Sequence, residues 1–361
     1  MKMRKIVCSF MISVVCFMTA ISGVSATSYD TSKINAAYSK VVEYYKNNNN
    51  LNNADKILAV ESLGLEAESN QFDTSSADLS STSLSKKIVT EVLLGVDPTE
   101  DKKTLESQID ENGNVEGSWG ASSDVWTLYA LYVTSSEKTN LIANKLNDEL
   151  AASSVCGYEW GGTYYADYDT TGWVIEGLAV VNKEKYATTI NKAIDYIKNN
   201  TTMTTTGWVT ADNVDTQSQV LEGMFAYDTN ALLNDSYTVH PVDCLLNTQL
   251  SDGSFPSGYN AEYTTAEVAK TLGTYKNGSV IIKAKKAYDK MMNPEQPDNT
   301  KPAQPRDTKK DSQSTNKVET TNQKTTSVKT GDETNVVIFV SLSMVSGGLF
   351  LVLRKEYERV H

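Results

Sequence analysis

The chain has 361 residues and a formal net charge of −12, and it contains only two His. The acid excess lies between residues 27 and 291, where 36 Asp and Glu stand against 20 Lys and no Arg. A surface this acidic repels nucleic acids and anionic lipids, and the lack of Arg removes the usual bidentate clamp for phosphate. These counts exclude a nucleic-acid partner. They also give no basis for expecting a metal, a Ser-His-Asp triad or a cofactor, because His240 is the only His before the last residue.

Residues 1–26 have the pattern of a secretory signal peptide. Basic residues at positions 2, 4 and 5 precede an apolar run over 6–21, and the small residues 24–26 offer a cleavage site. We therefore expect the mature chain to begin near Thr27, outside the cytoplasm.

A fourfold internal repeat is the strongest signal of the folded region, residues 27–292. Its copies begin at Ser122, Asp169, Asp215 and Tyr263, spaced by 47, 46 and 48 residues. Every copy has Ser or Thr at its second position and Leu or Met at its tenth. A near-constant spacing of this length is typical of stacked helical hairpins, and we expect each copy to form one inner helix.

Amphipathic segments fill the chain between these copies. An apolar stripe runs from Tyr186 to Ile197 with the spacing of an outer helix, and Gly177 and Gly223 share a repeat position at which neighbouring helices could approach closely. Further helices are expected at 32–46, 53–63, 84–94, 99–110, 138–150 and 279–291. The pattern predicts an all-α fold of about twelve helices in six hairpins.

The ends of these hairpins carry a recognisable motif. Leu245, Gln249, Gly253 and Phe255 follow the spacing of the Q-W motif, with Phe in place of Trp, and the region therefore resembles the α/α toroids of terpene cyclases and prenyltransferases. An aromatic residue also precedes every repeat copy, at Trp119, Trp160, Trp208 and Phe255. The resemblance implies a toroid in which the Gln amide ties one outer helix to the following turn.

Asp169 has two possible roles, one implied by this resemblance and one by its repeat position. Class II cyclases of that group protonate their substrate with the middle Asp of a D-x-D-D motif, to which residues 167–170 come closest without the fourth Asp. Because Ser122 and Asp215 hold the same repeat position, we prefer to interpret Asp169 as a helix N-cap. No residues match the zinc ligands of the prenyltransferases or the thioester motif of complement-like toroids.

Residues 157–168 combine five aromatic residues, two acids and three Gly in one expected loop. Flat rings beside acidic groups can stack on sugars or enclose a cationic or apolar group. Alternatively, Trp160 and some of the Tyr only cover the edge of a hairpin. The ligand-binding candidates are Tyr158, Trp160, Tyr164, Tyr165, Tyr168 and, from the next repeat, Asp215.

The remaining thiols and the single His are expected to be structural. Cys156 and Cys244 lie almost two repeats apart, too far for a disulfide between stacked hairpins, and we expect two free, buried thiols. His240, Asp243 and Cys244 are close in sequence, but we interpret them as packing residues of an outer helix and not as metal ligands.

The C-terminal region has the pattern of a surface anchor. Residues 293–335 are polar and are expected to form a disordered stalk, followed by an uncharged run over 336–353 that would span about 27 Å as a helix and by a basic cytoplasmic tail at 354–361. Residues 327–332 resemble a Gram-positive sorting signal in which Ser327 and Val328 replace Leu-Pro. The resemblance implies sortase cleavage between Thr330 and Gly331 and attachment to the cell wall; the alternative is a plain membrane anchor.

Two functions fit this sequence. We prefer a surface-displayed module that binds an unidentified extracellular ligand, such as a glycan, a small apolar molecule or a protein. The alternative is an extracellular enzyme on an α/α barrel, cyclase-like or active on carbohydrate, that uses paired acids such as Asp167 and Asp169 with Glu159.

Overall fold

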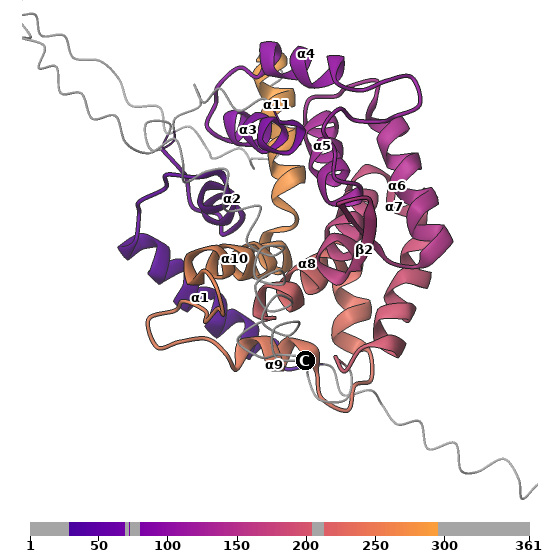
Figure 1. The fold of residues 1–361 in the computed structure, drawn as a ribbon. Coiled ribbons are helices and arrows are strands. Elements are labelled where there is room, and N and C mark those ends of the chain that lie inside the picture. The colour runs from indigo at the N-terminus through magenta and orange to yellow at the C-terminus, as the bar shows by residue number, and fades with distance from the viewer. Residues whose placement is uncertain (1–28, 69–71, 73–79, 204–212, 295–361) are drawn as a thin grey trace, which may run out of the picture. The chain divides into compact units, whose positions relative to one another are not determined.

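The computed structural model describes residues 29–68, 72, 80–203 and 213–294 of the chain (Figure 1). The expected signal peptide, the expected stalk from residue 295 onward, the sorting-like motif, the apolar run, the basic residues 354–361 and Trp208 lie outside these residues. Within the described part, no helix combines the length and the apolar character that crossing a membrane requires.

The described residues are mostly helical, as the sequence predicts, with one small antiparallel sheet. The elements are α1 (Ser32–Asn47), α2 (Ala54–Ser62), α3 (Ser81–Leu93), α4 (Thr99–Ser107), α5 (Ala121–Val133), α6 (Thr139–Ser153), β1 (Cys156–Trp160), β2 (Thr163–Asp167), α7 (Tyr168–Asn200), α8 (Val214–Asn234), α9 (Pro241–Leu246), α10 (Ala261–Asn277) and α11 (Val280–Met292). Asn182 and Asp228 have non-helical backbone angles, so each of α7 and α8 consists of two halves joined at a kink.

Six helical segments form a closed circuit of neighbours, which we call the inner ring. The ring runs from α2 to α3, α5, the first half of α7, the first half of α8 and α10, which packs again on α2. The four repeat copies lie in α5, α7, α8 and α10, so their prediction as helices is confirmed. Residues at equal repeat positions touch: Tyr129 contacts Glu176, and Gln219 contacts Glu267. The neighbouring helices therefore run in the same direction and in register.

Glycine permits the tightest contact of the ring, between α7 and α8. A Cβ atom on Gly223 would lie 2.3 Å from the carbonyl oxygen of Gly172, and one on Gly172 would lie 2.4 Å from that of Gln219. No side chain fits at these distances, because the two backbones are in direct contact. The close approach expected at Gly223 is confirmed, and it sets the second turn of α7 beside the second and third turns of α8.

The outer helices cover the ring with apolar stripes. In the second half of α7, Tyr186, Ile190, Ala193 and Ile197 are buried, as the periodicity predicts. At the last hairpin the Gln249 amide donates hydrogen bonds to the carbonyl oxygens of Gly253 and of Ala37 in α1, at 3.1 and 3.0 Å. The Q-W-like Gln therefore ties its own turn to the N-terminal helix, which packs outside α10 and completes the circuit.

The last helix differs from the expected outer helix. Instead of pairing with α10, α11 packs mainly on α3 and α5 and lies across the middle of the ring in Figure 1. Ser279, just before α11, donates a 2.6 Å hydrogen bond to Glu176, and Lys283 pairs with Glu61 at 2.6 Å. Because Glu61 lies in the last turn of α2, α11 covers the end of the ring formed by the C-termini of its helices.

Candidate ligand-binding site

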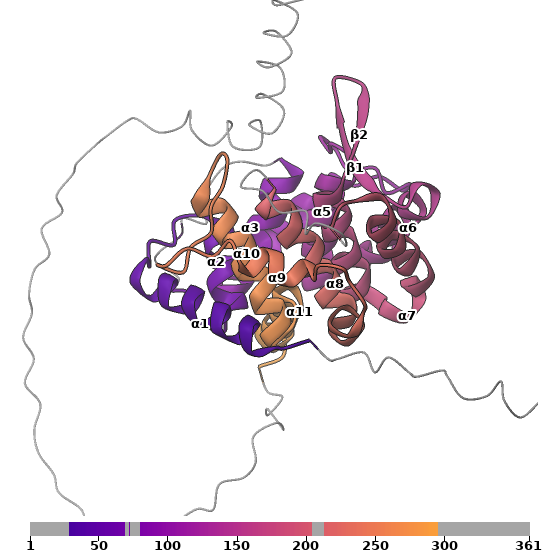
Figure 2. The same ribbon diagram turned by 90° about the horizontal axis from the view of Figure 1, so that it is seen from below.

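The segment expected as a loop at residues 157–168 is mainly a β-hairpin. Its strands pair in the register Trp160 with Thr163 and Tyr158 with Tyr165. Gly161 and Gly162 form the two-residue connection, and both have positive φ, at 57° and 77°. A turn of this type requires φ > 0 at both central positions, which Gly adopts without strain. Figure 2 shows β1 and β2 standing out from the helices.

One side of this hairpin is aromatic. Tyr158, Trp160 and Tyr165 alternate onto the same side, and the rings of Tyr158 and Tyr165 stack at 5.5 Å. Trp119, before α5, packs on Trp160 at 5.3 Å, and its carbonyl oxygen accepts a hydrogen bond from Glu159 N. We call Trp119, Tyr158, Trp160 and Tyr165 the aromatic face. Trp119 and Trp160 are each 37% exposed and Tyr165 is 44% exposed, so these rings are open to a ligand.

The other candidates of this segment lie elsewhere. Glu159 and Tyr164 alternate onto the opposite side, where the Tyr164 hydroxyl donates a 2.9 Å hydrogen bond to Glu149 of α6. Tyr168 is the first residue of α7 and lies near Tyr196 in the second half of that helix. The hypothesis that Glu159 forms an acid pair with Asp167 and Asp169 is therefore wrong, because Glu159 is exposed on the far side of the hairpin.

Asp169 is not the N-cap of its helix, which corrects the preferred interpretation. Asp167 caps α7: its Oδ1 accepts a 2.6 Å hydrogen bond from Thr170 N, and its Oδ2 accepts from the Thr170 hydroxyl. Asp169 lies two residues later, within the first turn. Asp215 likewise lies in the first turn of α8, whose cap is Asn213. The shared repeat position is thus a first-turn position that faces the neighbouring helix.

At this end of the ring, acidic and phenolic groups come together. The Tyr259 hydroxyl donates a 2.8 Å hydrogen bond to Asp215, and the rings of Tyr259 and Tyr263 lie 6.0 Å apart. Asp169 accepts a hydrogen bond from the side chain of Thr216, the residue after Asp215. We call Asp169, Asp215, Tyr259 and Tyr263 the ring mouth.

The carboxyl groups of the ring mouth hold protons more strongly than usual. Burial, and then the charge of Asp167, raise the pKa of Asp169 well above its ordinary value; Asp215 and Glu267 act in the same direction. Burial also raises the pKa of Asp215, opposed by the hydrogen bond from Tyr259. The charges of Asp167 and Asp169 raise the pKa of Tyr158 in addition to its burial, which places the aromatic face beside the ring mouth.

One helical turn further in, the side chains of Gln219, Glu267 and Trp173 form the floor of the ring mouth. Gln219 Nε2 donates to Glu267 Oε2 at 3.1 Å and lies 3.4 Å from the Tyr263 hydroxyl. Gln219 Oε1, Glu267 Oε1 and Trp173 Nε1 are buried without a hydrogen-bond partner among the described residues. Buried polar atoms are rarely left without a partner, so this floor can accept further hydrogen bonds from a ligand and donate one to it.

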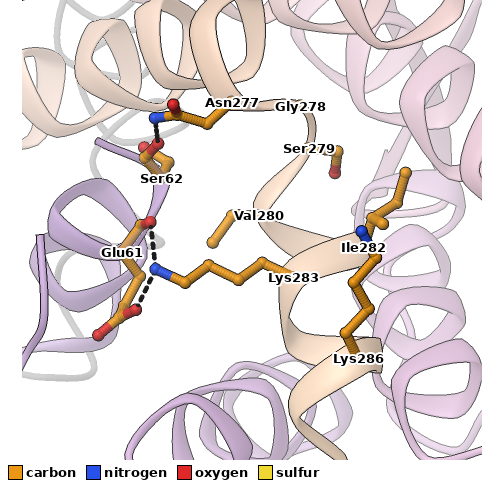
Figure 3. Close-up of a pocket in the computed structure, with 9 residues that line it drawn as sticks. All are labelled: Glu61, Ser62, Asn277, Gly278, Ser279, Val280, Ile282, Lys283 and Lys286. Carbon is orange, nitrogen blue, oxygen red and sulfur yellow. Dashed lines mark hydrogen bonds and ion pairs between the residues drawn. The ribbon is translucent and has the colours of Figure 1, made fainter. Parts of the chain in front are cut away.

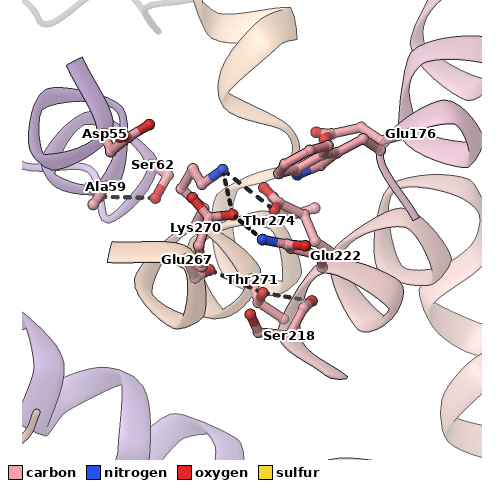
Figure 4. A network of polar contacts seen from close by, with 12 residues as sticks. Asp55, Ala59, Ser62, Glu176, Ser218, Glu222, Glu267, Lys270, Thr271 and Thr274 are labelled. Atoms are coloured by element: carbon pink, nitrogen blue, oxygen red, sulfur yellow. Dashed lines mark hydrogen bonds and ion pairs between the residues drawn. The ribbon is translucent and has the colours of Figure 1, made fainter. Parts of the chain in front are cut away.

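Below the floor, a buried lysine holds the helices together (Figure 4). Lys270 is 3% exposed and pairs with Glu267 at 3.0 Å and with Glu222 at 3.8 Å. Burial opposes the charged form of Lys270, but the charges of Glu267 and Glu222 outweigh it and raise the pKa of the amine. Burial also raises the pKa of Glu222 and of Glu176. This network connects α8 to α10 in the interior of the ring.

These interior residues were missed in the sequence, although a signal was present. They occupy the fifth and eighth positions of the repeat, which share one helical face with the first position. The fifth positions are Trp126, Trp173, Gln219 and Glu267, and the eighth are Tyr129, Glu176, Glu222 and Lys270. In otherwise apolar inner helices, two columns of large polar or aromatic residues indicate a shared polar interior.

The thiols and the His take structural positions. Within the described residues Cys156 and Cys244 are both free, as expected, but only Cys156 is buried and Cys244 is half-buried. His240 caps α9 through Nδ1, which accepts from Val242 N, and its ring packs on Tyr29 at 4.3 Å. Asp243 accepts a hydrogen bond from Tyr29 at 2.6 Å and pairs with Lys33 at 3.0 Å.

A small pocket of about 200 Å³ lies at the opposite end of the ring, beside α11 (Figure 3). It is lined by the last residues of α2 and α10 and the first turns of α11, including Glu61, Asn277 and Lys283. Lys283 already pairs with Glu61 there, and the Asn277 amide donates to the carbonyl oxygen of Ser62 at 2.8 Å. The polar groups of this pocket serve the attachment of α11, whereas the floor of the ring mouth has polar atoms without partners among the described residues.

Comparisons with known proteins identify no similar protein. No protein-family model matches the chain, and no curated protein and no solved structure matches it significantly. The functional conclusion therefore rests on the residues of the aromatic face and the ring mouth.

Proposed function

We propose that this chain is an α/α toroid of six hairpins, displayed on the cell surface, that binds a glycan through the aromatic face and the ring mouth. The resemblance of the Q-W-like motif and the circuit of inner helices support the toroid. The signal-like N-terminus, the sorting-like residues 327–332 and the apolar run that follows them support surface display.

The observation that carries the binding function is the aromatic face. Trp160 and Tyr165 remain substantially exposed on a hairpin that stands out from the helices, and so does Trp119 beside it, although burying such rings would be favourable. Large exposed aromatic groups beside polar atoms are characteristic of binding surfaces. The flat rings fit the apolar faces of sugar rings, and the neighbouring carboxylates and amide of the ring mouth and its floor fit sugar hydroxyl groups.

A glycan-binding screen tests this function. The full chain is compared with a Trp119→Ala and Trp160→Ala double variant, and a Leu250→Ala variant, at an exposed apolar residue between α9 and α10, serves as the control. We expect glycan binding by the wild type and the control, and loss of binding in the double variant while its circular dichroism spectrum remains helical. Binding that survives in the double variant would move the site away from the hairpin.

A second candidate is an enzyme that uses Asp169 as a general acid. The raised pKa of Asp169 favours this, because a general acid must hold its proton near neutral pH. An enzyme would release altered products from the bound glycan, and Asp169→Asn would abolish that turnover. A ligand recovered unchanged after long incubation with the wild type supports the binding module instead.

The surface attachment has a separate test. Replacing Thr330 and Gly331 with Ala should leave the protein extractable by detergent if sortase normally links it to the cell wall. An unchanged distribution between wall and membrane fractions would support the plain membrane anchor.

A further inference from the structure

We propose that the ligand of the ring mouth carries a positively charged amine, which binds between Asp169 and Asp215. The proposal rests on the proposed binding function and narrows its ligand class to glycans or related molecules with a free amino group. It follows from the charge of the ring mouth, from the unsatisfied acceptors beneath it and from the aromatic rings around it.

The first argument is that the described part of the ring mouth has carboxylates without a facing cation. The charges that act most strongly on Asp169 are those of Asp167, Asp215 and Glu267, all of them acidic. The backbone contact of Gly172 with Gln219, one turn beyond Asp169 and Asp215, holds α7 and α8 together there and opposes a separation of the two carboxyl groups. A bound cation would relieve it.

The lysines nearest to the ring mouth have other partners. Lys56 pairs with Glu262 at 2.8 Å, and Lys86 pairs with Asp55 at 2.8 Å. Lys270 lies deeper and pairs with Glu267. Each is held by its own carboxylate, so the counter-charge for Asp169 and Asp215 must come from outside these residues.

The second argument is independent of charge and comes from hydrogen bonding. Gln219 is 1% exposed and Glu267 is fully buried, yet an oxygen of each side chain has no donor among the described residues. Both are acceptors, and both lie one turn below the ring mouth. An ammonium group has three donors and no acceptor, so it suits these two unpartnered oxygens. The unpartnered Trp173 Nε1 is then left for a hydroxyl group of the ligand.

The aromatic rings of the site add to this preference. Tyr158, Tyr259 and Tyr263 lie near the carboxyl groups of the ring mouth, and the faces of such rings attract cations. The interior of the ring already uses this interaction, because Lys86 Nζ lies 4.5 Å from the centre of the Trp126 ring. An amine-bearing sugar could place its ammonium group at the carboxylates while a neighbouring sugar ring stacks on the aromatic face.

Two probes that differ only at nitrogen test the proposal. One is a tetrasaccharide of glucosamine with free amines, and the other is the same tetrasaccharide with every amine acetylated. Calorimetric titration of the full chain near neutral pH should show the free-amine form binding about tenfold more tightly, as expected for one charge-assisted contact. In the Asp169→Asn and Asp215→Asn double variant this preference should disappear while the affinity for the acetylated probe is kept.

A matched variant separates the site from the general acidity of the protein. Glu137→Gln with Asp148→Asn removes the same charge from exposed positions near and on α6, and it should keep the preference. Equal affinity of the wild type for both probes would overturn the proposal and leave the proposed glycan binding standing. A preference that persists in the Asp169 and Asp215 variant would also overturn it. Failure of both probes to bind the wild type would count against both the amine and the glycan.

Discussion

Gln219 and Glu267 hold the same position of consecutive repeats, and the Gln219 amide donates a 3.1 Å hydrogen bond to the Glu267 carboxylate. Tyr129 and Glu176 form the equivalent kind of contact at 3.0 Å between two earlier copies. Glu222 and Lys270, at the eighth positions of the same two copies as Gln219 and Glu267, also pair, so α8 and α10 run in the same direction. The repeat therefore lines the ring with columns of side chains, and the polar columns determine both its cohesion and its site.

Removal of the buried amine should strongly destabilise the fold. Lys270→Met leaves Glu267 and Glu222 buried without their cation, and breaking a buried pair from one side typically costs about 3–5 kcal/mol. Denaturant unfolding measures the loss. Adding Glu267→Gln to this variant should recover part of it, whereas Lys283→Met, at a partly exposed pair, should cost much less. Equal losses at both lysines would contradict the role of the buried network.

Two neighbouring aspartates should behave differently. Asp167→Ala removes the cap of α7 and should lower the unfolding free energy by about 1 kcal/mol, with recovery in Asp167→Asn or Asp167→Ser. Asp169→Asn should keep or raise the melting temperature, because it removes a carboxylate that burial and Asp167 disfavour in its charged form. Melting curves of the four variants test this. An unfolding free energy that Asp167→Ala leaves unchanged would contradict the assignment of the cap to Asp167.

Gly177 and Gly223 hold the same repeat position, but only Gly223 should be intolerant of a side chain. Gly223→Ala places a Cβ atom 2.3 Å from the Gly172 carbonyl oxygen and should destabilise by about 1–3 kcal/mol, despite the better helix propensity of Ala. Gly177→Ala meets only side chains, the nearest at 3.2 Å from Leu128, and should be nearly neutral. Chemical denaturation compares the two, and a tolerated Gly223→Ala would show that α7 and α8 can move apart.

The stability contributed by Glu91 should fall as the pH rises. Burial, and then the charge of Asp101, raise the pKa of Glu91 to about 8, against opposition from Lys87. The folded state therefore holds a proton that the unfolded state releases above about pH 4.3. Between the two pKa values stability decreases with pH, by at most about 1.4 kcal/mol per pH unit from this group.

The side chain introduced by Glu91→Gln cannot ionise. Comparison of this variant with the wild type therefore isolates the pH dependence due to Glu91 from that due to other buried carboxyl groups. Its unfolding free energy relative to the wild type should increase from about pH 5 to about pH 8 and level off above. A constant difference across this range would mean that Glu91 has an ordinary pKa in the folded protein.

The sequence predicted the helices well and the site only in part. The spacing of Ser122, Asp169, Asp215 and Tyr263 identifies four inner helices because a repeated helix must meet its neighbour at the same positions. In the sequence, Glu176 is only a single acid in an otherwise apolar segment. Its role depends on Tyr129 and Ser279, which lie 47 and 103 residues away. Such contacts form only when the ring closes, and the periodicity of a single segment does not predict them.

Two elements, α11 and the β1–β2 hairpin, differ from what the local sequence indicates. The strongly amphipathic sequence of α11 fits an outer helix equally well, and only the packing of α1 outside α10 leaves α11 to cover the end of the ring. Residues 157–168 are expected to form a loop, whereas the structure has a hairpin there. Gly161 and Gly162 between two alternating segments are nevertheless a recognised hairpin signal. Only the pairing of the strands shows that Glu159 and Asp167 lie on opposite sides.

The most direct test of the binding site uses the five Trp residues of the chain as reporters. The full chain is labelled with 5-fluorotryptophan, and its fluorine NMR signals are assigned with single Trp→Phe variants. On titration with the amine-bearing tetrasaccharide, we expect the signals of Trp119, Trp160 and Trp173 to shift with one common affinity while that of buried Trp126 stays in place. Saturable binding that leaves the Trp119 and Trp160 signals unchanged would contradict the assignment of the site to the aromatic face.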